Sequence, residues 1–177
     1  VMEIGGMQSM GARCHECPFA RRKPVPSTGA TPQNAYNARF VILTDYPSRE
    51  EEIAGELFVG ASGMVLDKQL EYWGEDRHRR VFVTSAVACR PKSTDNEKDR
   101  KKAAMCCRPR LRKEIGQIRQ TQGRRVKILA LGKYALFTLT GKDKLLSWCG
   151  PADVPEDITL MDARTDDPKW KPKKSDV

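Results

Sequence analysis

The sequence predicts an α/β protein, a three-layer α/β/α structure around a central, mostly parallel sheet of four strands. Apolar runs of strand length recur along the chain, and segments with helical spacing separate them. The 177 residues suffice for one sizeable core but not for two. Sheets of this class bind their ligands at the carboxyl ends of the strands, so polar residues at those ends are the first candidates for a site.

Three apolar runs indicate buried strands. They cover 38–44 (ARFVILT), 80–87 (RVFVTSAV) and 126–132 (VKILALG). Runs with so few polar residues suit strands that are covered on both faces. A fourth strand is expected where ITLM begins at Ile158, and the segment 23–37, rich in Pro, Ser, Thr and Asn, is expected to be a loop.

Helices are expected between these runs. Ser48 can cap a helix whose first turn is acidic, and apolar residues at helical spacing follow in MVLDKQLEYW from Met64. The charged stretch 95–120 is helix-prone, but Pro109 should kink or divide it, because proline has no amide hydrogen to donate. KYALFTLTG, 133–141, predicts a helix that is ended by glycine.

Composition restricts the class of partner. The formal charge is +9, with 32 Lys and Arg against 23 Asp and Glu. This excess favours a polyanionic partner such as nucleic acid, although it is also compatible with a merely well-solvated surface. No apolar run approaches the roughly 20 residues that span a bilayer, and the start of the sequence lacks the apolar segment of a signal peptide. We therefore expect a cytoplasmic location and no membrane partner.

The cysteines favour metal binding. Six cysteines in a chain expected in a reducing compartment are more typical of metal ligands than of disulfides. Cys14 and Cys17 form a C-x-x-C pair, the spacing at which one tight turn brings two thiolates to a metal centre. Cys89 and Cys107 each precede Arg-Pro, and they complete a set of four. Zinc would use the same ligands, so the spacing does not separate zinc from an iron–sulfur cluster.

The fourth ligand has an alternative. Cys106 and Cys107 are adjacent, so they point in different directions on a helix, and the Arg-Pro repeat favours Cys107. Either residue could instead be a small buried apolar residue, as free cysteine often is. Cys149 is left as a spare thiol. A thioredoxin-like redox role for Cys14 and Cys17 is the weaker interpretation, because no strand precedes the pair.

Taken in order, these motifs resemble the family 4 uracil-DNA glycosylases and the glycosylase-like modules associated with phage-type DNA polymerases. The matching pieces are CHECP, FVILTDYPSREEE, ELFVGASGMVLDKQL, VFVTSAVACRP, CCRPRL and VKILALGKYALFTLTG. The resemblance implies a uracil-DNA glycosylase-like fold. It also implies a structural four-iron four-sulfur (4Fe-4S) cluster, held by Cys14, Cys17, Cys89 and Cys107.

The resemblance also implies the organisation and the partners. We expect an N-terminal Cys-x-x-Cys segment at 1–22, a glycosylase-like domain at 23–161 and a basic, disordered tail at 162–177. DNA is the expected partner. Replication or repair proteins such as a DNA polymerase are further candidates, in the cytoplasm of a bacterial or phage-infected cell.

Some base-contacting residues of the family have counterparts here. Asp45 matches the acidic residue that helps to position the attacking water in the family motif Gly-Glu-Ala-Pro-Gly; alternatively, it only ends a strand and caps the next helix. Phe58 matches the aromatic that stacks on a flipped uracil. Tyr46 and Ser48 replace small residues of the motif, and we expect the Tyr46 ring to occupy the place of the flipped base.

Two departures predict weak uracil excision. The family's Thr-Asn pair, whose Asn amide reads uracil, is Thr-Ser here and ends at Ser85, and a hydroxyl cannot offer the paired donor and acceptor of an amide. The His of the family's His-Pro motif stabilises the departing uracil anion, and its loss can cost on the order of 100-fold in rate. The histidines here are His15 and His78, and the corresponding region offers only Arg164 or Lys169.

We therefore expect an iron–sulfur, glycosylase-like DNA-binding protein that is weak or inactive toward uracil and accessory to replication or repair. One alternative is an active glycosylase for uracil or another damaged base, using Asp45, Phe58 and Ser85. Another is a protein-interaction module that retains the fold. The phosphate contacts are expected from a set of basic residues, Arg90, Lys92, Arg108, Arg110 and Arg112.

Overall fold

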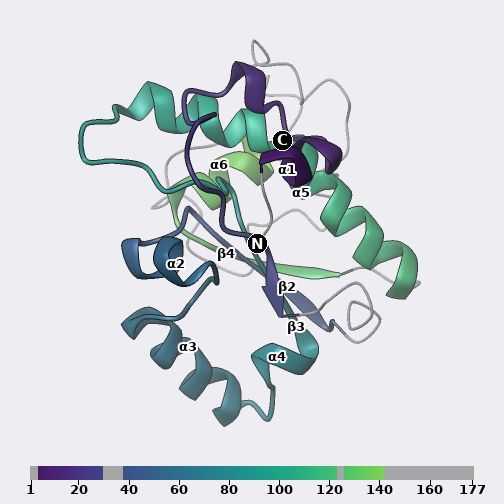
Figure 1. Cartoon of the computed structure of the whole chain (residues 1–177). Helices are drawn as coiled ribbons and strands as arrows, with labels where there is room; N and C mark the ends of the chain where they lie inside the picture. The colour runs from purple at the N-terminus through teal and green to yellow at the C-terminus, as the bar shows by residue number, and fades with distance from the viewer. Residues whose placement is uncertain (1–3, 30–37, 123–125, 142–177) are drawn as a thin grey trace.

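The sheet of the computed structural model, which describes residues 4–29, 38–122 and 126–141, has helices on both faces (Figure 1). Its strands are β1 (Thr28–Gly29), β2 (Phe40–Thr44), β3 (Val81–Ser85) and β4 (Lys127–Leu131), in the order β1-β3-β2-β4. β2 pairs in parallel with β3 and with β4, whereas β1 pairs antiparallel with β3. The α/β class is confirmed as a three-stranded parallel sheet flanked by helices.

The fourth strand of this sheet is not the predicted one. β1 lies within 23–37, which the sequence predicted to be a loop, and it has only two residues, too few for an apolar pattern to reveal. Its residues Thr28 and Gly29 pair with Val83 and Phe82. The strand expected at Ile158 lies outside the described residues.

The helices form two layers (Figure 1). α2, α3 and α4 cover one face of the sheet, and α1, α5 and α6 cover the other. No helix within the described ranges combines the length and apolarity needed to cross a membrane. The helical bounds are α1 Ile4–Ser9, the 3₁₀ turn η1 Cys14–Glu16, α2 Arg49–Ala54, α3 Ala61–Tyr72, α4 Arg77–Arg80, α5 Glu97–Gln122 and α6 Lys133–Thr140.

The core explains why the strands are apolar without interruption. On the face of α2 to α4, Ile42 and Val83 pack with Phe58. On the face of α5 and α6, Leu43 packs with Leu111. Adjacent residues of β2 therefore enter different layers, as the alternation of a strand requires.

Pro109 was expected to kink or divide this region, and the structure excludes the division, because α5 is one helix of 26 residues with Pro109 inside it. Proline cannot donate to the carbonyl four residues earlier, that of Met105. The Arg13 guanidinium donates to the Met105 carbonyl instead, at 3.3 Å, and the Arg13 amide donates to the Cys106 carbonyl at 2.9 Å. Arg13, next to Cys14, thus donates hydrogen bonds to the Met105 and Cys106 carbonyls of α5. These two hydrogen bonds anchor the segment that carries Cys14 to α5.

Candidate functional site

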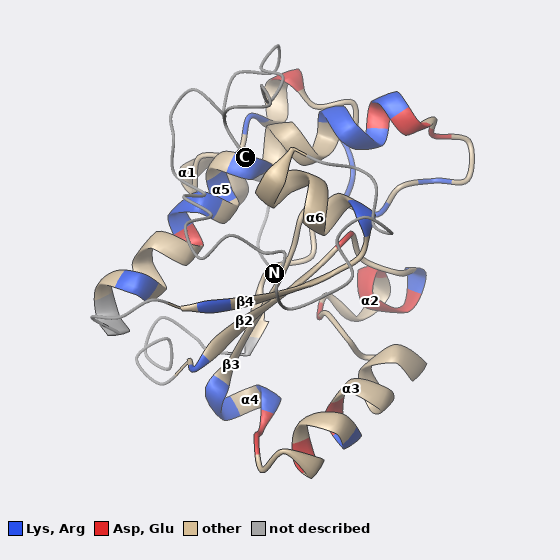
Figure 2. Ribbon diagram, turned by 180° about the vertical axis from the view of Figure 1, so that it is seen from behind, with Lys and Arg blue, Asp and Glu red and all other residues tan. Residues whose placement is uncertain are grey.

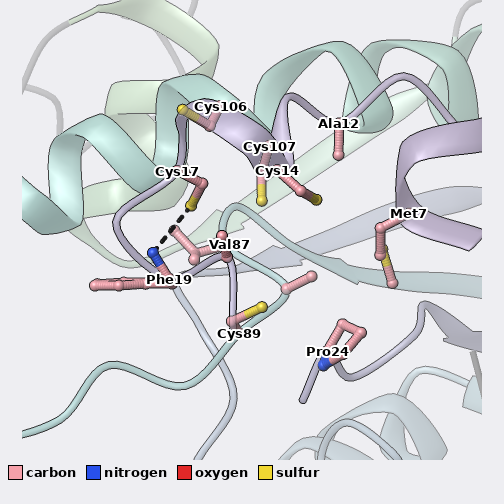
Figure 3. A pocket seen from close by; sticks show the side chains of 12 residues that line it. Met7, Ala12, Cys14, Cys17, Phe19, Pro24, Val87, Cys89, Cys106 and Cys107 are labelled. Carbon is pink, nitrogen blue, oxygen red and sulfur yellow. Dashed lines mark hydrogen bonds between the residues drawn. The ribbon is translucent and has the colours of Figure 1, made fainter. Parts of the chain in front are cut away.

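Five cysteines line one cavity (Figure 3). Cys14 and Cys17 lie in and just after η1, Cys89 follows β3, and Cys106 and Cys107 lie in α5. The structure therefore brings together all four predicted ligands from three separate segments of the chain. The remaining lining is apolar and is formed by Met7, Ala12, Phe19, Ala20, Pro24, Val87 and Ala88.

The orientation of the sulfur atoms separates Cys107 from Cys106. In Figure 3 the sulfurs of Cys14, Cys17, Cys89 and Cys107 surround a common space, whereas the Cys106 sulfur lies outside this ring, beyond Cys17. Neighbouring residues of a helix point in directions about 100° apart, so the two sulfurs reach different parts of the cavity lining. This arrangement favours Cys107 as the fourth ligand.

The thiols influence one another electrostatically. Burial, together with the neighbouring thiols, raises the pKa of Cys89 to about 12. Burial also raises the pKa of Cys14 and of Cys107. Cys17 and Cys106 share a side-chain hydrogen bond, which raises the pKa of Cys17 and lowers the pKa of Cys106. Thiolates held this close in apolar surroundings repel one another, and cations placed among them would relieve the repulsion.

The donor set fits a four-cysteine cluster. Four thiolates in an apolar cavity are the ligands of 4Fe-4S clusters, although thiolates also bind zinc. Among the side chains that the structure describes, no three His, Cys, Asp or Glu residues form a group that could hold one metal ion. The fit to a cluster therefore rests on the four sulfurs around a shared space.

Arg22 holds two of the cysteine segments together. Its guanidinium lies 3.9 Å from the centre of the Phe19 ring, donates to the Arg90 carbonyl at 3.1 Å and pairs with the Asp95 carboxylate at 2.7 Å. The Cys89 thiol in turn donates to the Arg22 carbonyl at 3.7 Å. No sequence pattern points to Arg22. For Arg13 a signal was available in Pro109, because a proline inside a helix leaves a carbonyl for another donor.

Asp45 acts as a helix cap. Its carboxylate Oδ1 accepts hydrogen bonds from the amides of Tyr134, at 2.9 Å, and Ala135, at 2.8 Å, at the start of α6. Burial raises the pKa of Asp45, while these amides act in the opposite direction. Asp45 was expected to cap the next helix, α2, but it caps α6. Ser48 caps α2. A role as a base would require this carboxylate to serve both α6 and the attacking water.

Tyr46 lies on the α6 side of the sheet. Its ring centre is 5.8 Å from that of Tyr134, and its hydroxyl accepts a hydrogen bond from Arg100 at 3.3 Å. The Tyr134 hydroxyl donates to Glu97 at 2.6 Å, and Lys133 pairs with Glu97 at 2.7 Å. Burial, followed by Glu97, raises the pKa of Tyr134, and Lys133 lowers that of Glu97.

Phe58 and Ser85 lie on the opposite face of the sheet from Tyr134. Phe58 has φ 58° and packs with Val83, and its amide donates to the buried carboxylate of Glu51. Strand alternation sends Ser85 to the same face as Val83. The Ser85 hydroxyl is buried and has no hydrogen-bond partner among the described residues. The structure thus groups Phe58 with Ser85 but places Tyr46 elsewhere, so the Tyr46 ring does not stand in for a base stacked on Phe58.

The predicted phosphate-contacting set needs correction. Arg110 is 0% exposed and Arg108 is 2% exposed, so neither can present its charge to DNA. Arg90 is half-buried and pairs with Glu52 at 2.7 Å, whereas Lys92 is exposed and Arg112 is half-buried. The sequence did not reveal this burial, because α5 directs the side chains of Arg108 and Arg110 into the core. Lys and Arg are spread over several helices (Figure 2).

The histidines do not replace the missing one. His15 lies in η1 beside the cysteines, and His78 lies in α4, before the amino end of β3. Ser85 is at the carboxyl end of that strand. Arg164, Lys169 and Cys149 lie outside the described residues.

These observations describe an α/β protein with a four-cysteine site beside the carboxyl edge of a parallel sheet. The sequence signature of the Uracil DNA glycosylase superfamily matches residues 32–166, about three quarters of the chain, and the chain therefore belongs to this superfamily. Several curated relatives carry the name type-4 uracil-DNA glycosylase, which confirms the predicted family.

The similarity covers different shares of these relatives. The type-4 uracil-DNA glycosylase of Pyrobaculum aerophilum is 30% identical over 146 residues, which is 80% of this chain and 68% of that protein. That of Saccharolobus solfataricus is 32% identical over 111 residues, 60% of this chain and 47% of the relative. That of Archaeoglobus fulgidus is 34% identical over 80 residues, 44% of this chain and 37% of the relative.

Proposed function

We propose that this protein is an iron–sulfur, glycosylase-like DNA-binding protein that excises uracil very slowly or not at all and acts as an accessory in DNA replication or repair. The low activity is inferred from Ser85. Its buried hydroxyl lies on the same face of the sheet as Phe58, at the position where the family has an amide. Membership of the superfamily supports DNA as the polymer that is bound.

A 4Fe-4S cluster would be held by Cys14, Cys17, Cys89 and Cys107. When bound, it would join the N-terminal segment, the loop after β3 and α5 by metal–sulfur bonds, and this role is structural. The arrangement of the four sulfurs supports the cluster, and zinc is the alternative that metal analysis would detect. The polar contacts of Arg13 and Arg22 hold the same segments in place around the site.

The base-reading site supports low activity. Phe58 supplies an aromatic face, buried to 7% exposure and held at positive φ by its core contacts and the Glu51 carboxylate. Ser85 offers one hydroxyl where uracil recognition uses an amide with a donor and an acceptor. The polar edge of the base would therefore be left partly unpaired, which is costly in a buried pocket.

The reacting groups support the same conclusion. Asp45 shares its carboxylate with the amides of α6, so it is less available to hold a water. His78 lies before the amino end of β3, and His15 lies in η1 among the cysteines. Loss of a stabiliser of the departing anion costs on the order of 100-fold or more in rate.

A second function is favoured by one observation. The Ser85 hydroxyl is buried without a partner in the described structure, and such a group is stabilised by a ligand that bonds to it. A damaged base other than uracil, with a single polar group at that position, would satisfy it. A protein-interaction role is the remaining alternative.

The test combines binding and excision on one cluster-loaded preparation. DNA binding should be independent of sequence and should weaken steeply as salt rises, because phosphate neutralisation releases counterions. Excision should be measured in parallel on single- and double-stranded DNA with uracil or other damaged bases. Binding without uracil excision supports the proposal, rapid release of another base supports the second function, and undetectable binding in low salt supports the protein-interaction role.

A further inference from the structure

Arg110 is the most deeply buried cation that the structure describes, with 0% exposure. Its Nη1 pairs with both carboxylate oxygens of Glu114, at 2.8 Å and 2.9 Å, and donates to the Thr84 hydroxyl at 3.1 Å. Its Nη2 donates to the Ser85 carbonyl. An arginine remains charged at any pH that a folded protein meets, so this charge is permanent.

The guanidinium lies beside the cysteine cavity. Arg110 follows Cys107 by three positions in α5, so the two share a helix face. The Ser85 carbonyl, to which it bonds, begins the turn whose residues Val87, Ala88 and Cys89 line the cavity (Figure 3). Arg110 thus connects the helix of one predicted ligand to the loop of another.

The positive charge of Arg110 lies close to the cysteine cavity. Glu114 lies one turn farther from Cys107 along α5, so the cation of this pair is the nearer charge. The Arg110 Nε–H is also buried, without a hydrogen-bond partner among the described residues.

We propose that Arg110 is a positioning residue of the cysteine site, the buried counter-charge that holds Cys89 and Cys107 in place and raises the reduction potential of the cluster. The inference rests on the proposed cluster. A nearby positive charge stabilises the more negative of two cluster states, and local charge is one of the factors that set cluster potentials. The same guanidinium holds the end of β3, so the cluster and the Ser85 region share one support.

The experiment is a redox titration of the cluster-loaded protein, followed by visible absorption, with iron and sulfide analysis of each variant. In Arg110→Met/Glu114→Met both charges are replaced together, because a buried carboxylate without its partner would destabilise the fold. Glu114→Gln keeps the cation and removes its neutralising partner. Arg110→Lys retains the charge. Arg39→Met/Glu75→Gln removes an ion pair of 2.7 Å near the amino end of β2 and is the matched control.

The potential should become more negative in the double methionine variant, more positive in Glu114→Gln, and stay close to that of the parent in Arg110→Lys and in the control. If the double variant does not fold, the opposite shift in Glu114→Gln still decides. A parent-like potential in the double variant or in Glu114→Gln overturns the inference while leaving the cluster intact. A parent protein without iron and sulfide contradicts the proposed cluster itself.

Discussion

At the residue scale, the two adjacent cysteines of α5 have different environments. The Cys107 sulfur faces the shared space of the cavity, while the Cys106 sulfur lies outside it (Figure 3). Sequence alone predicted that only one of them binds metal, because helix geometry separates neighbours. The Arg-Pro repeat already favoured Cys107, and the structure adds the position of α5 relative to η1, which depends on tertiary contacts such as those of Arg13.

Cys107→Ser should lose most of the iron and sulfide and the visible absorption, because three thiolates remain at a site that needs four. Cys106→Ser is the matched control and should keep them. Iron and sulfide analysis after anaerobic purification checks both variants. Equal losses in the two variants would show that Cys106 is also a ligand or is essential to the fold.

Ser85→Asn should increase uracil excision only partially, because it restores the base-reading amide but not the histidine that stabilises the leaving group. Single-turnover release of uracil from single-stranded DNA is the measurement. Tyr46→Ala is the control and should have little effect, since Tyr46 packs toward Tyr134 rather than Phe58. A gain from Tyr46→Ala that equals or exceeds that of Ser85→Asn would place Tyr46 in the pocket after all.

At the scale of elements, local signals predicted most of the fold. The apolar runs yielded β2, β3 and β4, and Ser48 starts α2 with the predicted cap. β1 was missed because a two-residue strand exists only through pairing with β3. The choice between a kinked and a divided helix at Pro109 was left open, and the burial of Arg110 was missed, because both depend on partners distant in sequence.

Gly132→Ala should destabilise the protein more than Gly74→Ala. Both glycines have positive φ, but Gly132 (φ 124°, ψ 173°) lies in a region almost exclusive to glycine, so the backbone strain is on the order of 1–3 kcal/mol there and about 1–2 kcal/mol at Gly74. A Cβ at Gly132 would also lie 2.2 Å from Oδ1 of Asp45, whereas nothing lies within 4 Å of one at Gly74. Chemical denaturation should show that Asp45→Ala lowers the free energy of unfolding less in the Gly132→Ala variant than in the parent protein. Equal costs for the two glycine changes would contradict the close approach.

Asp45 should make folding stability depend on pH. Its pKa is raised above 3.8 by burial, so the favourable contribution is present below 3.8 and is lost as the pH rises through the folded-state value. Relative to Asp45→Asn, the parent should therefore become less stable as the pH rises from 3.8 through the folded-state pKa of Asp45. Denaturation of both proteins across this range is the check. A parent that gains stability over the variant would show that the α6 amides outweigh burial.

At the scale of the whole molecule, the cysteine site and the base-reading face share the sheet as their support. α1 and η1 pack against α5 around the cysteine cavity. Ser85 is the last residue of β3, the strand that leads to Cys89. The division into 1–22, 23–161 and 162–177 stays a prediction. The described part of the first segment packs on the same core as α5, since Met7, Ala12 and Phe19 belong to one apolar cluster with Cys107.

We propose that this member of the superfamily binds DNA although its excision site is eroded. Single-turnover uracil release, measured on single- and double-stranded DNA with the cluster-loaded protein at saturating concentration, tests it most directly, because saturation removes weak binding as an explanation. We expect uracil release that is barely above that of DNA alone and is unchanged by Asp45→Ala. Rapid release that Asp45→Ala abolishes would contradict it.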